Sequence, residues 1–198
     1  MRPTAPELAH TLGLAPHPEG GFFRETYRAW EVVETPRGRR AACTAILFLV
    51  TAGAVSRLHR LSSDEIWVFQ GGQPLELITL APSGELSRVL LGDAAEPDAQ
   101  EAEKAAAPQA EAPQDVPPQA WASQAAAPQA LEPQALAPAG HWQGARLAGG
   151  THVPVEHAWC LVNCVVTPGF EYEDFEMGER AALLAAYPQH AALVRALT

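Results

Sequence analysis

Short apolar runs separated by turn residues make up most of the chain. The run CTAILFLVTAG (43–53) is short and contains several β-branched residues, which predicts a buried strand. The stretch PLELITLAPSGELSRVLLG (74–92) carries two such runs on either side of Pro82-Ser83-Gly84, so it predicts two strands joined by a turn. By the same reasoning, further strands are expected within residues 22–27, 134–150 and 157–177.

Helical patterns lie at the two ends of the chain. PELAHTLGL (6–14) has the apolar spacing of a short helix that stops at Gly13. GERAALLAAYPQHAALVRALT (178–198) predicts a helix, a break at Pro188 and a second helix. Many strands with helices at both ends predict an antiparallel barrel or sandwich with peripheral helices.

The segment between the two groups of strands has a different composition. From about residue 94 it consists mainly of Ala, Pro and Gln, and glutamine recurs every five residues from Gln109 to Gln134, preceded by proline except at Ser123. Proline at this spacing interrupts a regular helix and removes backbone donors from a sheet. We therefore expect residues 95–130 to be a disordered or polyproline-like insertion in a loop of a single domain that spans residues 1–198.

Composition narrows the function. A chain of 198 residues fits one domain, and its net charge of −10 argues against binding to nucleic acid through bulk charge. No apolar run approaches the length of about 18 residues that a membrane helix needs, so we expect a cytoplasmic protein without a membrane partner. Cys43, Cys160 and Cys164 have no CxxC spacing, which favours reduced, buried thiols.

The candidate chemistry lies in GAVSRLHRLSSDEIWVFQGG (53–72). The pattern predicts a strand that ends at Leu61, a turn at residues 62–64, and a second strand from Glu65. Side chains alternate between the faces of a strand, so His59 and Leu61 share a face and Glu65 can join them from the neighbouring strand. This arrangement would bring an imidazole and a carboxylate together inside a barrel.

Two motifs resemble those of the cupin superfamily. Its first motif has a glycine, two histidines one residue apart, a glutamate and a final glycine; here Leu61 stands in place of the second histidine, between Gly53 and Gly72. Its second motif ends in a third histidine, and in PAGHWQ (138–143) Gln143 stands at that position, with His141 two residues earlier.

Four longer segments narrow the resemblance to one family. GLAPHPEGGFFRETYR (13–28), HRLSSDEIWVFQGGQPLEL (59–77), PAGHWQGARL (138–147) and PGFEYEDFEM (168–177) are similar in sequence and order to the cupin family DUF985, also called Cupin_5. The resemblance implies an all-β fold with peripheral helices, the double-stranded β-helix or cupin jelly-roll barrel, usually as a homodimer. It implies no particular reaction, because a fold does not determine a function.

Three functions are consistent with these residues. A divalent transition metal could bind His59 and Glu65, completed by Gln143 or His141, although two of the four cupin ligand positions are lost. Alternatively, acid–base chemistry of the isomerase or epimerase kind could act on a small polar ligand, sugar-like or acidic, with His59 as base and Glu65 as its orienter or partner acid. The third function is binding of a ligand without catalysis. A reading without any function is also open, in which His59 and Glu65 are a hydrogen-bonded pair in the core.

Further residues are expected at the ligand. Aromatic rings would line the mouth of the barrel, an amide would hydrogen-bond the ligand, and arginines would pair with a phosphate or carboxylate. The two glycines of HPEGG (17–21) let the backbone approach a ligand closely and place acidic residues at the rim. The expected ligand-binding residues are Trp67, Phe69, Trp142, Gln143, Arg57, Arg60, Arg146 and Glu19. Arg24 and Glu25 are expected at the rim of the pocket together with Glu19.

Overall fold

A computed structural model describes residues 2–94, 130–148 and 153–198. The predicted insertion at 95–130 lies, except for its last residue, outside the described residues, so its conformation stays a prediction. Among the described residues, none of the helices has the length and apolar character needed to cross a membrane.

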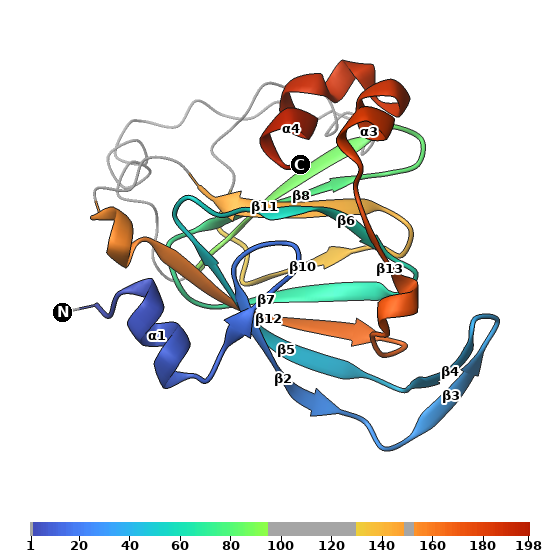
Figure 1. Cartoon of the computed structure of the whole chain (residues 1–198), viewed down its shortest axis with the longest axis horizontal. Coiled ribbons are helices and arrows are strands. Elements are labelled where there is room, and N and C mark those ends of the chain that lie inside the picture. Colours follow the sequence, from blue (N-terminus) through green and yellow to red (C-terminus); the bar gives the residue numbers. More distant parts are fainter. Residues whose placement is uncertain (1, 95–129, 149–152) are drawn as a thin grey trace, which may run out of the picture.

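Two antiparallel sheets face each other and form the body of the protein (Figure 1). The six-stranded sheet has the order β1 (Ala15–Pro16), β2 (Phe22–Arg28), β5 (Thr44–Thr51), β12 (Trp159–Thr167), β7 (Asp64–Gly72) and β10 (Gln134–Ala137). The five-stranded sheet has the order β13 (Phe175–Met177), β6 (Ser56–Leu61), β11 (Trp142–Leu147), β8 (Leu75–Leu80) and β9 (Leu86–Leu91).

The core lies between the two sheets. Alternate residues of β12 are buried, as expected for a strand with one face on a core: Cys160, Val162, Cys164 and Val166. Cys160, Val162 and Cys164 pack with side chains from the inner faces of both sheets, including Phe48, Trp67, Leu77 and Ala145. The buried thiols agree with the sequence-based expectation for Cys160 and Cys164, whereas Cys43 is only partly buried.

Helices cover outer surfaces, as the patterns predicted. Helix α1 (Ala5–Thr11) begins at a capping box between Thr4 and Glu7 and is followed by Gly13 with a φ of 62°. Helices α3 (Arg180–Ala186) and α4 (Ala191–Ala196) flank the short turn η4 (Pro188–His190) and pack on the outer face of the five-stranded sheet. The described residues also contain the 3₁₀ turns η2 (Val155–His157) and η3 (Tyr172–Asp174).

Two features were not foreseen. A hairpin of β3 (Val32–Thr35) and β4 (Gly38–Ala41) projects beyond the sandwich (Figure 1). In addition, β6 and β7 are not neighbours in one sheet: β6 pairs with β11 and β13, whereas β7 pairs with β12 and β10. The expectation that Glu65 joins His59 from a neighbouring strand is therefore corrected, because the two residues come from facing sheets.

Candidate functional site

A cavity of about 120 Å³ lies between the two sheets, where β13 and the η3 turn close one end of the sandwich. Its walls come from β2, β5, β6, β7 and β12 and from the segment 170–175. Its titratable lining residues are His17, Glu25, Arg28, His59, Glu65, Cys164, Glu171 and Tyr172. Most of its apolar surface comes from Phe23, Ile46, Leu61, Val166, Phe170 and Phe175.

His59 is held by one nitrogen of its ring. Nδ1 lies 2.8 Å from the backbone oxygen of Arg57 and 2.9 Å from Oε2 of Glu19. Both oxygens accept hydrogen bonds, so Nδ1 carries a hydrogen whether or not the ring is charged. Nε2 makes no hydrogen bond to any residue in the described part of the chain and is the nitrogen left for a ligand in the cavity.

Glu19 reaches His59 because the loop before β2 packs closely against β5 and β6. Gly20 has a φ of 112°, and a Cβ there would lie 2.3 Å from the backbone oxygen of Val55. Gly21 has a φ of 70°, and a Cβ there would lie 2.4 Å from the backbone oxygen of Leu49. Only glycine fits both positions, so these glycines bring the chain against backbone rather than against a ligand.

The carboxylate of Glu19 is buried and fully engaged. Oε2 meets Nδ1 of His59, and Oε1 accepts a hydrogen bond of 3.0 Å from Oγ of Ser56. The backbone N–H of Glu19 donates to Nδ1 of His17 at 3.3 Å, which makes that nitrogen an acceptor. Burial lowers the pKa of His17 and favours the same neutral ring.

Electrostatics make His59 and Glu19 an ion pair. Burial alone would lower the pKa of His59, but the charge and hydrogen bond of Glu19 raise it from 6.5 to about 9. Burial alone would raise the pKa of Glu19, but His59 holds it below its ordinary value. At neutral pH the cavity therefore faces an imidazolium.

Glu65 lines the same cavity and is held by an amide. Nε2 of Gln143 donates to Oε2 of Glu65 at 2.6 Å, and Oε1 of Gln143 accepts from Nε1 of Trp67 at 3.0 Å. Burial raises the pKa of Glu65 to about 7, although His59 and Gln143 oppose that rise. Glu65 can therefore gain and lose a proton near neutral pH.

The side chains do not fit the expected divalent metal. The amide oxygen of Gln143 already accepts a hydrogen bond from Trp67, so it is not directed at a shared ion. Within the described ranges, no group of three or more His, Cys, Asp and Glu side chains is arranged to hold a metal ion. His141 lies in the loop before β11, where Nδ1 of its ring is 3.3 Å from the backbone oxygen of Ala139, and it does not line the cavity.

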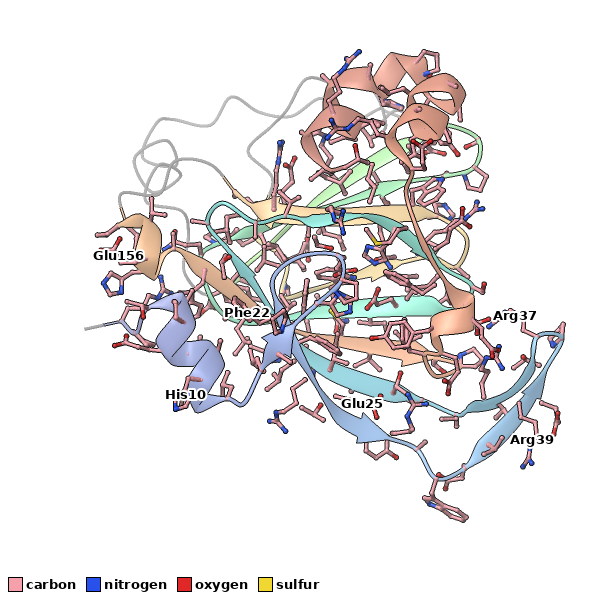
Figure 2. All side chains as sticks on the ribbon, in the orientation of Figure 1. His10, Phe22, Glu25, Arg37, Arg39 and Glu156 are labelled. Carbon is pink, nitrogen blue, oxygen red and sulfur yellow. The ribbon has the colours of Figure 1, made fainter. Side chains whose placement is uncertain are left out.

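The mouth of the cavity carries a charged cluster. Nε and Nη2 of Arg28 donate to the two carboxylate oxygens of Glu25, at 3.1 and 2.8 Å. Nη1 of Arg28 donates to Oε1 of Glu171 at 2.7 Å, and Nη2 also donates to the backbone oxygen of Phe170. Glu25 extends from β2 (Figure 2), so this cluster ties β2 to the segment that closes the cavity.

Further ion pairs fix that segment from the projecting hairpin. Nε and Nη2 of Arg40 donate to the two oxygens of Asp174 at 2.7 and 3.1 Å, and Arg37 lies 3.2 Å from the same carboxylate. Figure 2 shows Arg37 and Arg39 on different sides of the hairpin, and Arg39 pairs with Glu34 instead. The hairpin thus braces the wall of the cavity.

The expected aromatic residues lie elsewhere. Trp67 is 1% exposed and belongs to the main core, and Phe69 packs against that core. Trp142 is buried in the cluster beneath the C-terminal helices, where Arg60 lies over its ring. None of the three rings lines the cavity.

The expected anion-binding arginines also lie elsewhere. Arg57 is exposed and donates to the backbone oxygen of Pro18. Arg24, which the sequence suggested for the rim, donates to the backbone oxygen of Leu12. Arg60 pairs with a glutamate of β13, and Arg146 pairs with a glutamate of β8. Of the rim residues that the sequence suggested, Glu25 does line the cavity.

Sequence analysis missed several cavity residues. They are His17, Phe23, Arg28, Phe170, Glu171, Tyr172 and Phe175. All of them fall in the first and last of the four family-like segments, 13–28 and 168–177. The concentration of aromatic and charged residues in those segments was the available signal, but their arrival at one cavity depends on the sheet topology.

Comparisons with known proteins agree with the fold. The family model Cupin_5, described as "Cupin superfamily (DUF985)", matches residues 6–128 and 115–178. A solved structure of a hypothetical protein from Leishmania major is 30% identical, with 98% of each chain covered and a TM-score of 0.74. A solved structure of a protein from Shewanella oneidensis is 32% identical, covers 98% of this chain and 97% of its own, and has a TM-score of 0.71. No curated protein matches this sequence. The chain therefore belongs to the Cupin_5 (DUF985) family of the cupin superfamily.

Proposed function

We propose that this cupin is an enzyme that moves protons on a small polar molecule, in the manner of an isomerase or epimerase. One observation carries the proposal: His59 and Glu65 line a single cavity, and the Nδ1 hydrogen bonds of His59 leave Nε2 for a ligand. A buried imidazole and a buried carboxyl with different pKa values can act as a matched acid and base.

The electrostatics favour a particular assignment of roles. With a pKa of about 9, His59 carries a proton at neutral pH and suits the role of acid. With a pKa of about 7, Glu65 is ionised in about half of the molecules at pH 7 and suits the role of base. This assignment reverses the roles expected from the sequence.

A proton-transfer cycle follows from these roles. The Glu65 carboxylate takes a proton from a carbon next to a carbonyl group, and Nε2–H of His59 gives its proton to the carbonyl oxygen. The resulting enol takes a proton back from Glu65 on either face of the same carbon, and His59 recovers its proton from the enol hydroxyl. Where that carbon also bears a hydroxyl, the intermediate is an enediol; Glu65 can then protonate the former carbonyl carbon while His59 takes the proton of the second hydroxyl, which becomes the new carbonyl. Glu19 stays ionised throughout and stabilises the imidazolium between steps.

Deuterium exchange would test this proposal. The full chain is incubated in D₂O with hydroxy-aldehydes, hydroxy-ketones and keto acids that differ in charge, and loss of the proton signal next to the carbonyl is followed by NMR. We expect His59→Gln and Glu65→Gln each to slow the exchange by about 10²- to 10⁴-fold. The matched controls His10→Gln and Glu34→Gln alter exposed residues and should exchange at the wild-type rate.

Binding without exchange would instead support a non-catalytic ligand-binding cupin, the second reading of the sequence. Exchange that survives in His59→Gln and Glu65→Gln would show that other groups move the proton. The homodimer implied by the resemblance and the cytoplasmic location stay predictions; light scattering during size-exclusion chromatography would test the former.

A further inference from the structure

The charges around the cavity are predominantly negative. Glu25, Glu65 and Glu171 line it, and Glu19 lies directly behind His59. The facing cations are His59 and the Arg28 side chain at the mouth, since His17 is held neutral by burial. Three of these carboxyls exceed the two cations by one charge even while Glu65 is protonated, and by two charges once Glu65 ionises above its pKa of about 7. An anion that enters the cavity therefore meets net repulsion.

The cavity lining, as far as the structure describes it, has no uncommitted arginine to compensate an anionic ligand. Among the described residues, Arg28 is the one arginine or lysine that lines the cavity. Its guanidinium already donates to Glu25, to Glu171 and to the backbone of Phe170. An anion would have to break these bonds and leave two carboxylates without their shared partner.

The mouth also presents aromatic rings beside an available carboxylate oxygen. Phe170, Tyr172 and Phe175 lie edge to face with centroid separations of 5.1 to 6.4 Å, and all three line the cavity. Oε2 of Glu171 accepts no hydrogen bond from any residue that the structure describes. Aromatic faces together with a carboxylate are the surroundings that attract an organic ammonium group.

The buried end points to a ligand as well. His59 lines the cavity, and Nε2 has no hydrogen-bond partner in the described part of the chain. A polar nitrogen at a cavity wall is open to a hydrogen bond from a ligand or water. A polar group of the ligand at this nitrogen would satisfy it while the opposite end of the molecule lies at the mouth.

We propose that the ligand of this cavity is a small molecule bearing an ammonium group, such as an amino sugar. The ammonium lies at the mouth, between Oε2 of Glu171 and the rings of Tyr172 and Phe175. The uncharged, oxygen-bearing end lies at His59 and Glu65. Only the reaction at that inner end rests on the proposed function; the preference for positive charge rests on the mouth.

Three compounds with the same carbon skeleton and different charges test the proposal. Isotope-labelled full-length protein is titrated at about pH 6.5, where an amine of this kind is protonated, with glucosamine, glucose and gluconate. Chemical shifts of the phenylalanine and tyrosine rings report binding at the cavity. We expect glucosamine to bind at least about tenfold more tightly than gluconate, with glucose between them.

A charge-removing variant sharpens the test. Glu171→Gln takes away the carboxylate at the mouth and weakens the hold on Nη1 of Arg28, so the ratio of glucosamine to gluconate affinity should fall at least about fivefold. Glu34→Gln removes a more exposed carboxylate, on the projecting hairpin and outside the cavity lining, and should leave the ratio unchanged. The aromatic signals of the folded variants check that each remains native.

The outcomes separate this inference from the proposed function. Gluconate binding as tightly as glucosamine, no binding by any of the three compounds, or an unchanged ratio in Glu171→Gln would overturn the ammonium preference. Glucosamine binding without deuterium exchange would leave the preference standing and contradict the enzymatic proposal. Deuterium exchange seen only with anionic compounds would support the enzymatic proposal and contradict the ammonium preference.

Discussion

Replacing Glu19 by glutamine should lower the pKa of His59. Glutamine has nearly the same shape, so its side-chain oxygen can still accept a hydrogen bond from Nδ1 of His59. Oγ of Ser56 can also keep a partner, because its bond of 3.0 Å needs only an acceptor or a rotated hydroxyl. The variant therefore removes one buried negative charge, 2.9 Å from the ring, with little change in packing.

The size of the effect follows from the raised pKa. The shift of His59 from 6.5 to about 9 corresponds to about 3 kcal/mol of preference for the charged ring. Burial opposes that shift, so the groups that raise the pKa together supply more than the net value; Glu19 is the largest of them, ahead of Glu65 and the backbone oxygen of Arg57. Without its charge, burial dominates, and we expect the pKa of His59 to fall by at least about 2 units, to about 7 or below.

Nitrogen NMR of histidine-labelled protein measures this directly. The two ring nitrogens of His59 are followed from pH 5 to pH 10 in wild type, in Glu19→Gln and in the control Glu34→Gln. Wild type should titrate near pH 9 and, once neutral, show its hydrogen on Nδ1, and the control should match it. A His59 pKa that stays above about 8 in Glu19→Gln would refute the assignment of Glu19 as the source of the shift.

The ion pair of His59 and Glu19 should also make the free energy of unfolding depend on pH. The raised pKa of His59 contributes stability that is fully present below about pH 6.5 and is lost as the pH rises through about 9. The lowered pKa of Glu19 contributes stability above about pH 4.5 that is lost as the pH falls further. The difference in unfolding free energy between wild type and Glu19→Gln should therefore be largest between these limits and shrink on either side.

Three further predictions concern the supports of the site. In urea unfolding, the free energy of unfolding of Glu65→Gln should rise by up to about 3 kcal/mol relative to that of wild type as the pH rises from 4.5 through 7. The reason is that the raised pKa of Glu65 makes its ionisation oppose folding in wild type. A difference between the two proteins that stays constant across that range would contradict the raised pKa. Gln143→Leu should lose about 1–3 kcal/mol in the same assay, since Nε1 of Trp67 is left buried without an acceptor, and a neutral effect would show that the amide bridge contributes little. Gly21→Ala should lower the melting temperature strongly, because the new Cβ would lie 2.4 Å from the backbone oxygen of Leu49; wild-type stability would show that the loop relaxes freely.

Local alternation was enough to predict that His59 and Leu61 share one face of their strand. His59 and Leu61 lie two residues apart on β6, and both line the cavity together with Glu65. The parity of a strand is a local property, so it could be deduced without knowing which strands pair. The same rule could not say that β6 and β7 belong to facing sheets, because pairing depends on contacts far apart in the sequence.

Neighbouring residues on one strand show where the sequence argument was inconsistent. Trp142 and Gln143 are adjacent on β11, so their side chains must point to opposite faces. Only one of them could face the interior between the sheets. Gln143 does so and bonds Glu65, whereas Trp142 packs under the C-terminal helices. Hydrophobicity did not distinguish the two faces, because both faces of this sheet are covered.

Glu19 illustrates what lies beyond local patterns. It is separated by 40 residues from His59, and its approach requires two glycines with positive φ packed against the backbone of Leu49 and Val55. The sequence offered the glycines, but their close contact with backbone, rather than with a ligand, depends on the tertiary fold. The orienting partner of His59 was therefore beyond prediction, although Glu19 itself was among the candidate residues.

The arrangement of hydrogen bonds argues that the buried polar groups are more than a structural core pair. Burying an imidazole and two carboxyls is unfavourable unless each finds partners, and a purely structural network would engage every polar atom. Here Glu19 holds His59 by Nδ1 alone, and Gln143 holds Glu65 from the core while both titratable groups line one cavity. Nε2 of His59 is left without a bond to the described residues beside an ionisable carboxyl. A network satisfied on its core side and open on its cavity side is expected where a ligand completes it.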